Sequence, residues 1–135
     1  MVTAQAAGSR ILVIDDDAAL LAFTCRYLSR LGYSLVPYRS AEEAWKHFQA
    51  AGAQYSLVVI DLSMRGISGE QLCRMMLGLY PQLRLILTSG YPFDAERSLT
   101  AEPGRVVFLH KPFTPAMLVE TVNQLIGAGP KRDVD

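Results

Sequence analysis

The sequence contains little cysteine and little histidine, with two residues of each. Cys25 and Cys73 lie far apart in the chain, inside two different helical patterns, and none of the four residues has the spacing of a zinc site. We expect both cysteines to behave as small buried hydrophobic residues in a reducing compartment. A disulfide or a shared metal is the alternative interpretation.

Long apolar runs and an excess of charge are also absent. No stretch approaches the roughly 20 apolar residues that span a bilayer, and residues 1–10 lack the charged and apolar regions of a signal peptide. Thirteen basic residues balance thirteen acidic ones, so no overall field attracts nucleic acid or an anionic membrane. We therefore expect a cytoplasmic chain that binds neither membrane nor nucleic acid.

Two kinds of segment alternate along the 135 residues, which suffice for one domain with a single core. Short, apolar, β-branched segments are expected to be strands: 11–14, 35–38, 57–60, 85–87 and 106–109. Apolar residues with helical spacing predict four helices, carried by Leu20, Phe23, Tyr27, Leu28 and Leu31; by Ala41, Ala44, Trp45 and Phe48; by Leu72, Met75, Met76 and Leu79; and by Leu118, Val122, Leu125 and Ile126. A weaker helix is expected within 94–101.

This alternation predicts an α/β fold with a doubly wound, five-stranded parallel sheet and helices on both faces. Pro37 cannot donate a ladder hydrogen bond, so the second strand is expected at a sheet edge. The flavodoxin-like order 2-1-3-4-5 satisfies this requirement and places the ligand site where strands one and three end. Helix N-caps are predicted at Asp17, Ser40, Ser68 and Thr114.

Polar side chains follow four of the predicted strands. They are Asp15, Asp16 and Asp17; Asp61; Thr88 and Ser89; and His110 and Lys111, the last followed by Pro112. Two carboxylates about 5 Å apart repel by roughly 3 kcal/mol at an effective dielectric of about 20, so such a cluster needs a cation. Hard oxygen ligands suit Mg²⁺, or Mn²⁺ in its place. A carboxylate nucleophile, a metal and an ammonium group together indicate an aspartyl-phosphate site.

The motifs ILVIDDD, SLVVIDLSMRGISG, LILTSG and FLHKPF, in this order, resemble the response-regulator receiver domain of two-component signalling. The resemblance covers residues 10–128 and leaves tails at 1–9 and 129–135. It implies that Asp15 and Asp16 position Mg²⁺ and that Asp61 takes a phosphoryl group from a phosphohistidine. The backbone carbonyl of Ser63 would be the third metal ligand from the protein.

The resemblance also implies how the domain signals. Lys111, joined to Pro112 by a cis bond, would contact the phosphoryl group, with Thr88 as the switch hydroxyl and Ser89 as its small neighbour. The ring of Phe108 would turn inward when Thr88 moves, reshaping the face formed by the weaker helix within 94–101, the fifth strand and the last helix. The chain would be a signalling switch rather than an enzyme, catalysing only its own phosphorylation and dephosphorylation. Its partners would be a histidine kinase, a histidine phosphotransfer protein or, through that face, a second copy.

Several residues keep a second interpretation. Asp17 suits a helix N-cap but could be a metal ligand, and Thr88 could be an ordinary strand residue. Lys111 could be solvated, and Phe108 could serve only the core. Arg65 stands where the family commonly has proline, beside the expected metal, and we expect this difference to tune the site modestly.

Two other functions compete with this interpretation. A haloacid-dehalogenase-like phosphatase would use Asp15 as its nucleophile, since Asp15-x-Asp17 matches a DxD motif. A receiver-like interaction module would never be phosphorylated. Architecture also stays open, because residues 129–135 are too few for an output domain. The chain is expected to be a stand-alone regulator or a receiver from a longer protein such as a hybrid histidine kinase.

Overall fold

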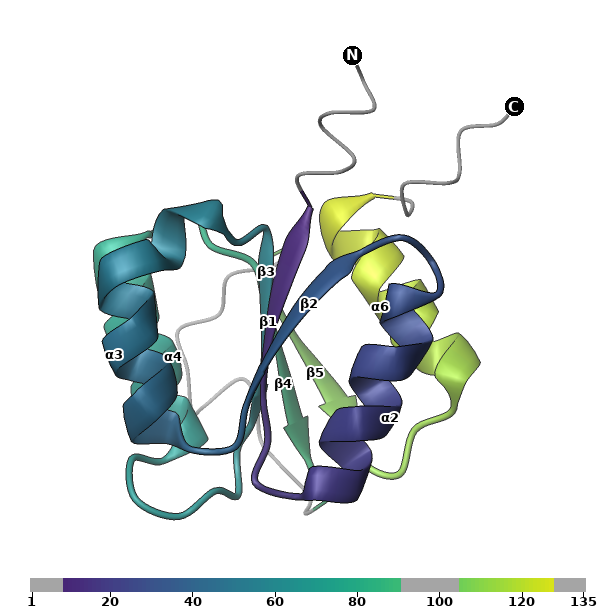
Figure 1. The fold of residues 1–135 in the computed structure, drawn as a ribbon, viewed down its shortest axis with the longest axis horizontal. Helices are drawn as coiled ribbons and strands as arrows, with labels where there is room; N and C mark the ends of the chain where they lie inside the picture. The colour runs from purple at the N-terminus through teal and green to yellow at the C-terminus, as the bar shows by residue number, and fades with distance from the viewer. Residues whose placement is uncertain (1–8, 91–104, 128–135) are drawn as a thin grey trace.

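A computed structural model describes residues 9–90 and 105–127, which form a parallel sheet between two layers of helices (Figure 1). The strands are β1 (Arg10–Ile14), β2 (Ser34–Tyr38), β3 (Leu57–Asp61), β4 (Leu85–Ser89) and β5 (Val106–His110). The helices are α2 (Ala18–Ser29), α3 (Ala41–Ala51), α4 (Gly69–Leu79) and α6 (Pro115–Ile126), with a 3₁₀ turn η1 (Gly52–Gln54). The helix predicted within 94–101 lies outside the described residues.

The strand order is β2-β1-β3-β4-β5, with every neighbouring pair parallel, as predicted. Pro37 is exposed on the edge strand β2, opposite Val13 of β1. This order brings the carboxyl ends of β1 and β3 side by side, because the two strands pair from Ile11–Leu57 to Ile14–Ile60. Residues that follow these two strands are therefore neighbours in space.

The two faces of the sheet carry two apolar clusters, covered by α3 and α4 on one side and by α2 and α6 on the other (Figure 1). The largest fully buried side chains of the first include Phe48, Leu72 and Met76, and those of the second include Ile11 and Leu28. Central strands are buried on both faces, which explains their continuous apolar sequences. The resulting sandwich holds the strand ends in fixed positions.

The predicted apolar stripe of the first helix was partly wrong. The helix buries Leu21, Thr24 and Leu28, whereas Phe23 is 38% exposed and stacks on Tyr27 with ring centroids 6.2 Å apart. Thr24 occupies a central position of the buried face, and a polar residue there disguised the true periodicity. In α3 and α6 the predicted stripes are the buried ones, apart from the half-buried Trp45 and Ile126.

All four predicted N-caps are confirmed. Asp17 accepts hydrogen bonds from the Ala19 and Leu20 amides, at 3.1 and 3.2 Å. The hydroxyls of Ser40, Ser68 and Thr114 each accept from the amide three residues later. These caps fix where each helix leaves the carboxyl edge of the sheet.

Both cysteines are free thiols, Cys73 fully buried and Cys25 half-buried. Burial raises the pKa of the Cys73 thiol to about 12. Within the described part of the chain, every helix is too short or too polar to cross a bilayer.

Candidate functional site

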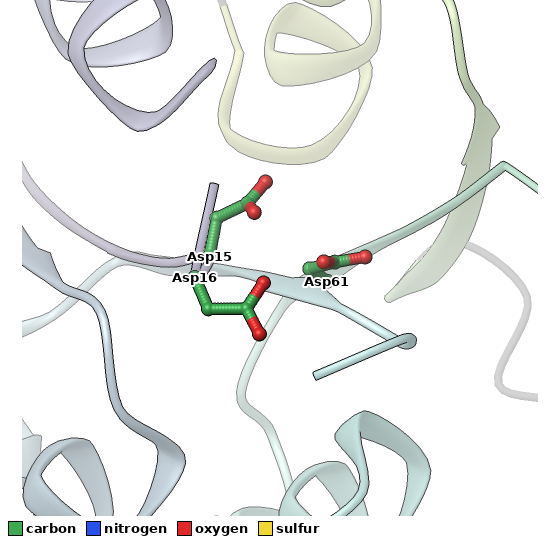
Figure 2. Close-up of side chains that lie close together, drawn as sticks. All are labelled: Asp15, Asp16 and Asp61. Atoms are coloured by element: carbon green, nitrogen blue, oxygen red, sulfur yellow. The ribbon is translucent and has the colours of Figure 1, made fainter. Parts of the chain in front are cut away.

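Three aspartates meet at the carboxyl edge of the sheet. Asp15 and Asp16 follow β1, Asp61 ends β3, and one carboxylate oxygen from each lies within 4.8 Å of the other two. Figure 2 shows the three side chains lying close together at the ends of the two strands. Asp15 is only 6% exposed and Asp61 only 4%, so two of the three charges are held away from bulk water. Such crowding of buried carboxylates is unfavourable without a cation.

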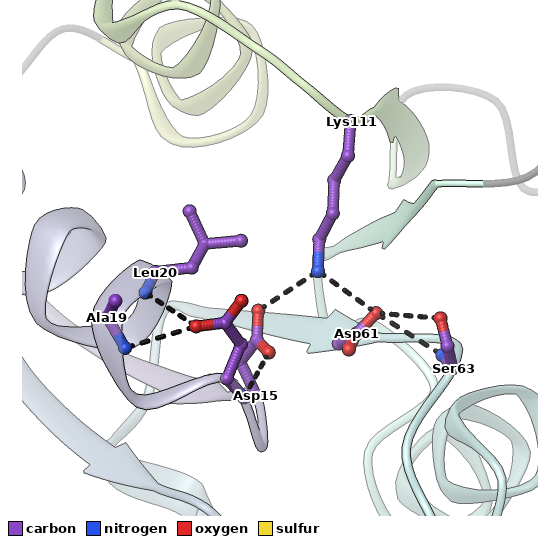
Figure 3. A network of polar contacts seen from close by, with 7 residues as sticks. Asp15, Ala19, Leu20, Asp61, Ser63 and Lys111 are labelled. Atoms are coloured by element: carbon purple, nitrogen blue, oxygen red, sulfur yellow. Dashed lines mark hydrogen bonds and ion pairs between the residues drawn. The ribbon is translucent and has the colours of Figure 1, made fainter.

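Lys111 reaches this cluster from the end of β5. Its Nζ lies 3.3 Å from Asp15 Oδ2 and 3.4 Å from Asp61 Oδ1, bridging the two strands (Figure 3). The backbone supports this placement, because the Lys111 amide donates to the Ser89 carbonyl at 2.8 Å. The Lys111–Pro112 bond is cis, as the resemblance implied. One ammonium group thus partly offsets three carboxylates.

The electrostatics of Asp15 reflect this imbalance. Burial raises the pKa of the Asp15 carboxyl, and the nearby Asp61 carboxylate raises it further. The Asp17 amide, which donates to Asp15 Oδ1 at 2.9 Å, and the Lys111 ammonium both act to lower this pKa, but the net direction is upward. A bound cation would favour the ionised carboxylate.

The two oxygens of Asp61 have different surroundings. Oδ1 accepts hydrogen bonds from the backbone amide of Ser63 at 3.2 Å and from its hydroxyl at 3.4 Å, and it also faces Lys111 (Figure 3). Oδ2 receives no hydrogen bond from any residue that the structure describes. The carboxylate is therefore held through one oxygen, and the other is left to react or to bind a metal.

The remaining predicted site residues lie around this centre. Thr88 is buried opposite Asp61 in the β3–β4 ladder, and Ser89 follows it, also buried. Phe108 pairs with Leu87 and packs, half-buried, on the sheet face covered by α3 and α4. The structure places Phe108 beside the site rather than in it. The switch roles of Thr88 and Phe108 remain predictions.

Neither histidine joins the acid cluster. His110 is exposed at the end of β5. His47 is half-buried on α3, and its Nε2 lies 2.6 Å from the Tyr55 hydroxyl oxygen. Asp17 serves as the N-cap of α2, and its carboxylate is not one of the three that converge.

Gly69 was not identified as a site residue in the sequence. A Cβ at this position would lie 2.5 Å from the Asp61 carbonyl oxygen and 2.6 Å from Leu62 Cα. Only glycine lets the first turn of α4 pack directly on the end of β3. The signal in the sequence was a glycine immediately after the Ser68 N-cap, since glycine disfavours helix and needs another reason to stand there.

Comparisons with known proteins agree with this geometry. The family model described as the response regulator receiver domain matches residues 11–123. Sensor kinase CckA of Brucella abortus (strain 2308) is 30% identical over 120 residues, covering 88% of this chain and 13% of that protein. Transcriptional regulatory protein ResD of Bacillus subtilis (strain 168) is 30% identical over 122 residues, covering 90% and 50%. The chain thus spans at most half the length of these two relatives.

Solved structures show the same fold. A response regulator receiver protein from Sinorhizobium medicae WSM419 superposes with a TM-score of 0.77 at 28% identity, covering 89% of this chain and 95% of that one. The receiver domain from the hybrid histidine kinase CckA has a TM-score of 0.72 at 28% identity, covering 87% and 99%. These findings support a phosphoacceptor and neither of the two competing functions. The chain belongs to the response regulator receiver domain family and is a phosphoacceptor domain of two-component signalling.

Proposed function

We propose that Asp61 is the phosphoryl acceptor, taking its phosphoryl group from a phosphohistidine. An Asp61 carboxylate oxygen forms the new bond to phosphorus while the phosphorus–nitrogen bond breaks, and the electron pair leaves with the imidazole, which then takes up a proton. Receiver domains interact with histidine kinases or phosphotransfer proteins, and either is the donor proposed here. The observation that carries the proposal is Asp61 itself, with Oδ1 anchored by Ser63 and Lys111 and Oδ2 left without a hydrogen bond from the described residues.

Receiver domains bind Mg²⁺ at an acidic pocket, and the residues here fit that ion. The carboxylates of Asp15, Asp16 and Asp61 would hold it, together with the backbone carbonyl of Ser63, and Mn²⁺ would suit the same oxygens. When bound, the ion supplies positive charge to the crowded carboxylates and to the incoming phosphoryl group. The proximity of three hard oxygen donors supports this assignment.

Lys111 and Thr88 complete the proposed mechanism. The Lys111 ammonium, already between Asp15 and Asp61, would neutralise a phosphoryl oxygen. Thr88 would donate a hydrogen bond to another oxygen, with Ser89 leaving room for it, and Phe108 would follow this movement. The domain then acts as a switch by shifting between two populations rather than by converting a separate substrate.

The proposed output is a change of partner. The face formed by β5, α6 and the helix predicted within 94–101 would bind either a target protein or a second copy of the chain. We propose residues 10–128 as the receiver domain, working in the cytoplasm. It serves as a stand-alone regulator or as part of a longer protein such as a hybrid histidine kinase.

Incubation with acetyl phosphate and Mg²⁺, followed by mass spectrometry of the intact protein, tests the acceptor. The wild-type protein should gain the mass of one phosphoryl group, and Asp61→Asn should gain none while keeping its fold. Glu43→Ala, on the exposed surface of α3, should label like the wild type. An unlabelled wild-type protein, or a phosphoryl group mapped to Asp15, would contradict the proposal.

A further inference from the structure

The segment between β3 and α4, residues 62–68, borders the acid cluster and carries Ser63. Its two ends are tied to β3. At the beginning, the Ser63 amide and hydroxyl donate to Asp61 Oδ1, and at the end Gly69 packs directly on the Asp61 carbonyl. Met64 is anchored by burial, with 7% of its surface exposed. The middle of the segment, Arg65 and Gly66, is exposed and has no such anchor in β3.

A carboxylate from α3 reaches this middle part. Glu42 Oε2 accepts a hydrogen bond from the Ile67 amide at 3.2 Å. The same carboxylate lies over Gly66. A Cβ added at Gly66 would clash with Glu42 Oε2 and would lie 3.1 Å from the Glu42 carboxyl carbon. Among the described residues, this is the only hydrogen bond that joins residues 63–67 to a residue outside β3 and the segment itself.

Glu42 is itself fixed by the start of α3. It stands in the first helical turn, where the positive end of the helix favours a carboxylate, and its Oε1 lies 3.4 Å from the Ser40 hydroxyl. Glu42 and Asp16 line one cavity of about 450 Å³ together with Arg65. Glu42 therefore lines the same cavity as Asp16, one of the three clustered aspartates.

We propose that Glu42 is a positioning residue of the metal site, acting through the Ile67 amide and the Gly66 backbone to fix the segment that presents Ser63 toward Mg²⁺. The inference rests on the proposed function, since it concerns the same ion. Glu42 touches neither the ion nor the phosphoryl group in this scheme. It narrows the conformations of residues 63–67, so that less ordering is required when the ion binds.

Calorimetric titration of the metal-free protein with MgCl₂ tests this role. Glu42→Ala should raise the Kd for Mg²⁺ about 10-fold, at the lower end of the effect of losing an outer support of a metal site. Glu42→Gln keeps an oxygen that can accept from the Ile67 amide, so its Kd should stay within about twofold of the wild-type value. Glu43→Ala removes the neighbouring carboxylate of the same helical turn and should leave the Kd unchanged.

Amide exchange by NMR, without metal, gives the second readout. Glu42→Ala should accelerate exchange of the Ile67 amide about 10-fold, the loss expected when its single acceptor is removed. Glu43→Ala should not change it. Exchange is measured separately for each amide. A general loss of stability would therefore accelerate exchange at all amides, and that result would contradict a local role for Glu42.

The outcomes separate the two levels of inference. Wild-type protein that fails to bind Mg²⁺ would overturn the proposed metal site and this inference with it. Wild-type binding that Glu42→Ala retains, or that Glu43→Ala weakens equally, would overturn the role of Glu42 alone. Failure of Glu42→Gln to restore binding would show that charge rather than the hydrogen bond to Ile67 matters, and would also contradict the proposal.

Discussion

Along β1 and β3, four buried apolar residues are followed by one buried carboxylate. Residues 11–14 and 57–60 are at most 4% exposed, and Asp15 and Asp61, which come next, are 6% and 4% exposed. Burial of the apolar part contributes about 25 cal/mol per Å². Burial of a carboxylate costs free energy unless charge or hydrogen bonds compensate it. The interior of the sheet therefore stabilises the fold, while its carboxyl edge reduces stability and provides the chemistry.

A mutation in the interior gives the largest expected effect on this contrast. Phe48 is fully buried on α3 and packs edge-on against Tyr80, with centroids 5.4 Å apart. Phe48→Ala should lower the free energy of unfolding by about 3–5 kcal/mol in denaturant titration. Phe23→Ala, on the exposed face of α2, should cost less than about 1 kcal/mol. Equal losses at the two positions would remove the distinction between interior and surface.

The junction of interior and edge is tested by two glycines of α4. Gly69→Ala places a Cβ against the Asp61 carbonyl and should cost about 1–3 kcal/mol of stability. It should also weaken Mg²⁺ binding, because the end of β3 must shift. Gly78→Ala meets nothing within 4 Å in the same helix and should stabilise the protein by up to about 1 kcal/mol. A Gly69→Ala protein with wild-type stability and Mg²⁺ affinity would refute the close packing.

Thermal unfolding with and without Mg²⁺ tests the carboxyl edge of the sheet alone. Mg²⁺ at ten times its Kd should stabilise the folded protein by about 1.4 kcal/mol, which raises the midpoint by a few degrees. A bound ion would offset both the cost of burying the Asp15 carboxylate and its repulsion by the Asp61 carboxylate. A protein carrying Asp15→Asn and Asp16→Asn should show no such shift, and an equal shift in that protein would place the ion elsewhere.

The smallest expected effect is the reactivity of an interior thiol. Burial raises the pKa of Cys73 to about 12 from an ordinary value of 9.0, so the neutral thiol favours folding below pH 9 and this contribution is lost as pH rises toward 12. At pH 8.5 iodoacetamide should leave Cys73 unmodified in the folded protein. The half-buried Cys25, whose pKa burial also raises, should react slowly. In denaturant both should react, and rapid modification of folded Cys73 would contradict its burial.

Much of the fold could be predicted because its signals are local. Apolar segments identified all five strands, but the predictions for β3, β4 and β5 stopped at the last apolar residue. The ladder continues through polar residues such as Asp61, Thr88 and Ser89, since backbone hydrogen bonds do not depend on side-chain polarity. The prediction placed the wrong face of α2 toward the core, because the polar Thr24 is one of its buried residues. A polar residue at a buried position cannot be recognised from periodicity alone.

The acid cluster was predictable for a related reason. Asp15, Asp61 and Lys111 each lie at the carboxyl end of a strand, and a parallel sheet brings such residues together. The supports of the site were not predictable in the same way. Gly69 acts through a backbone contact with β3, and Glu42 acts across 25 positions of sequence on the Ile67 amide. The glycine after the Ser68 N-cap signals that Gly69 has a special role, but only the three-dimensional structure relates Gly69 and Glu42 to the site.

The proline of β2 has a consequence for molecules that meet in a crowded cell. The Tyr38 carbonyl accepts from the Asp15 amide, so the backbone of Tyr38 faces β1 and that of Pro37, one residue earlier, faces the open side of the edge strand. An incoming strand would find no N–H to pair with at that point. Arg39 adds a charge just beyond it. This border of the sheet thus resists strand-to-strand aggregation.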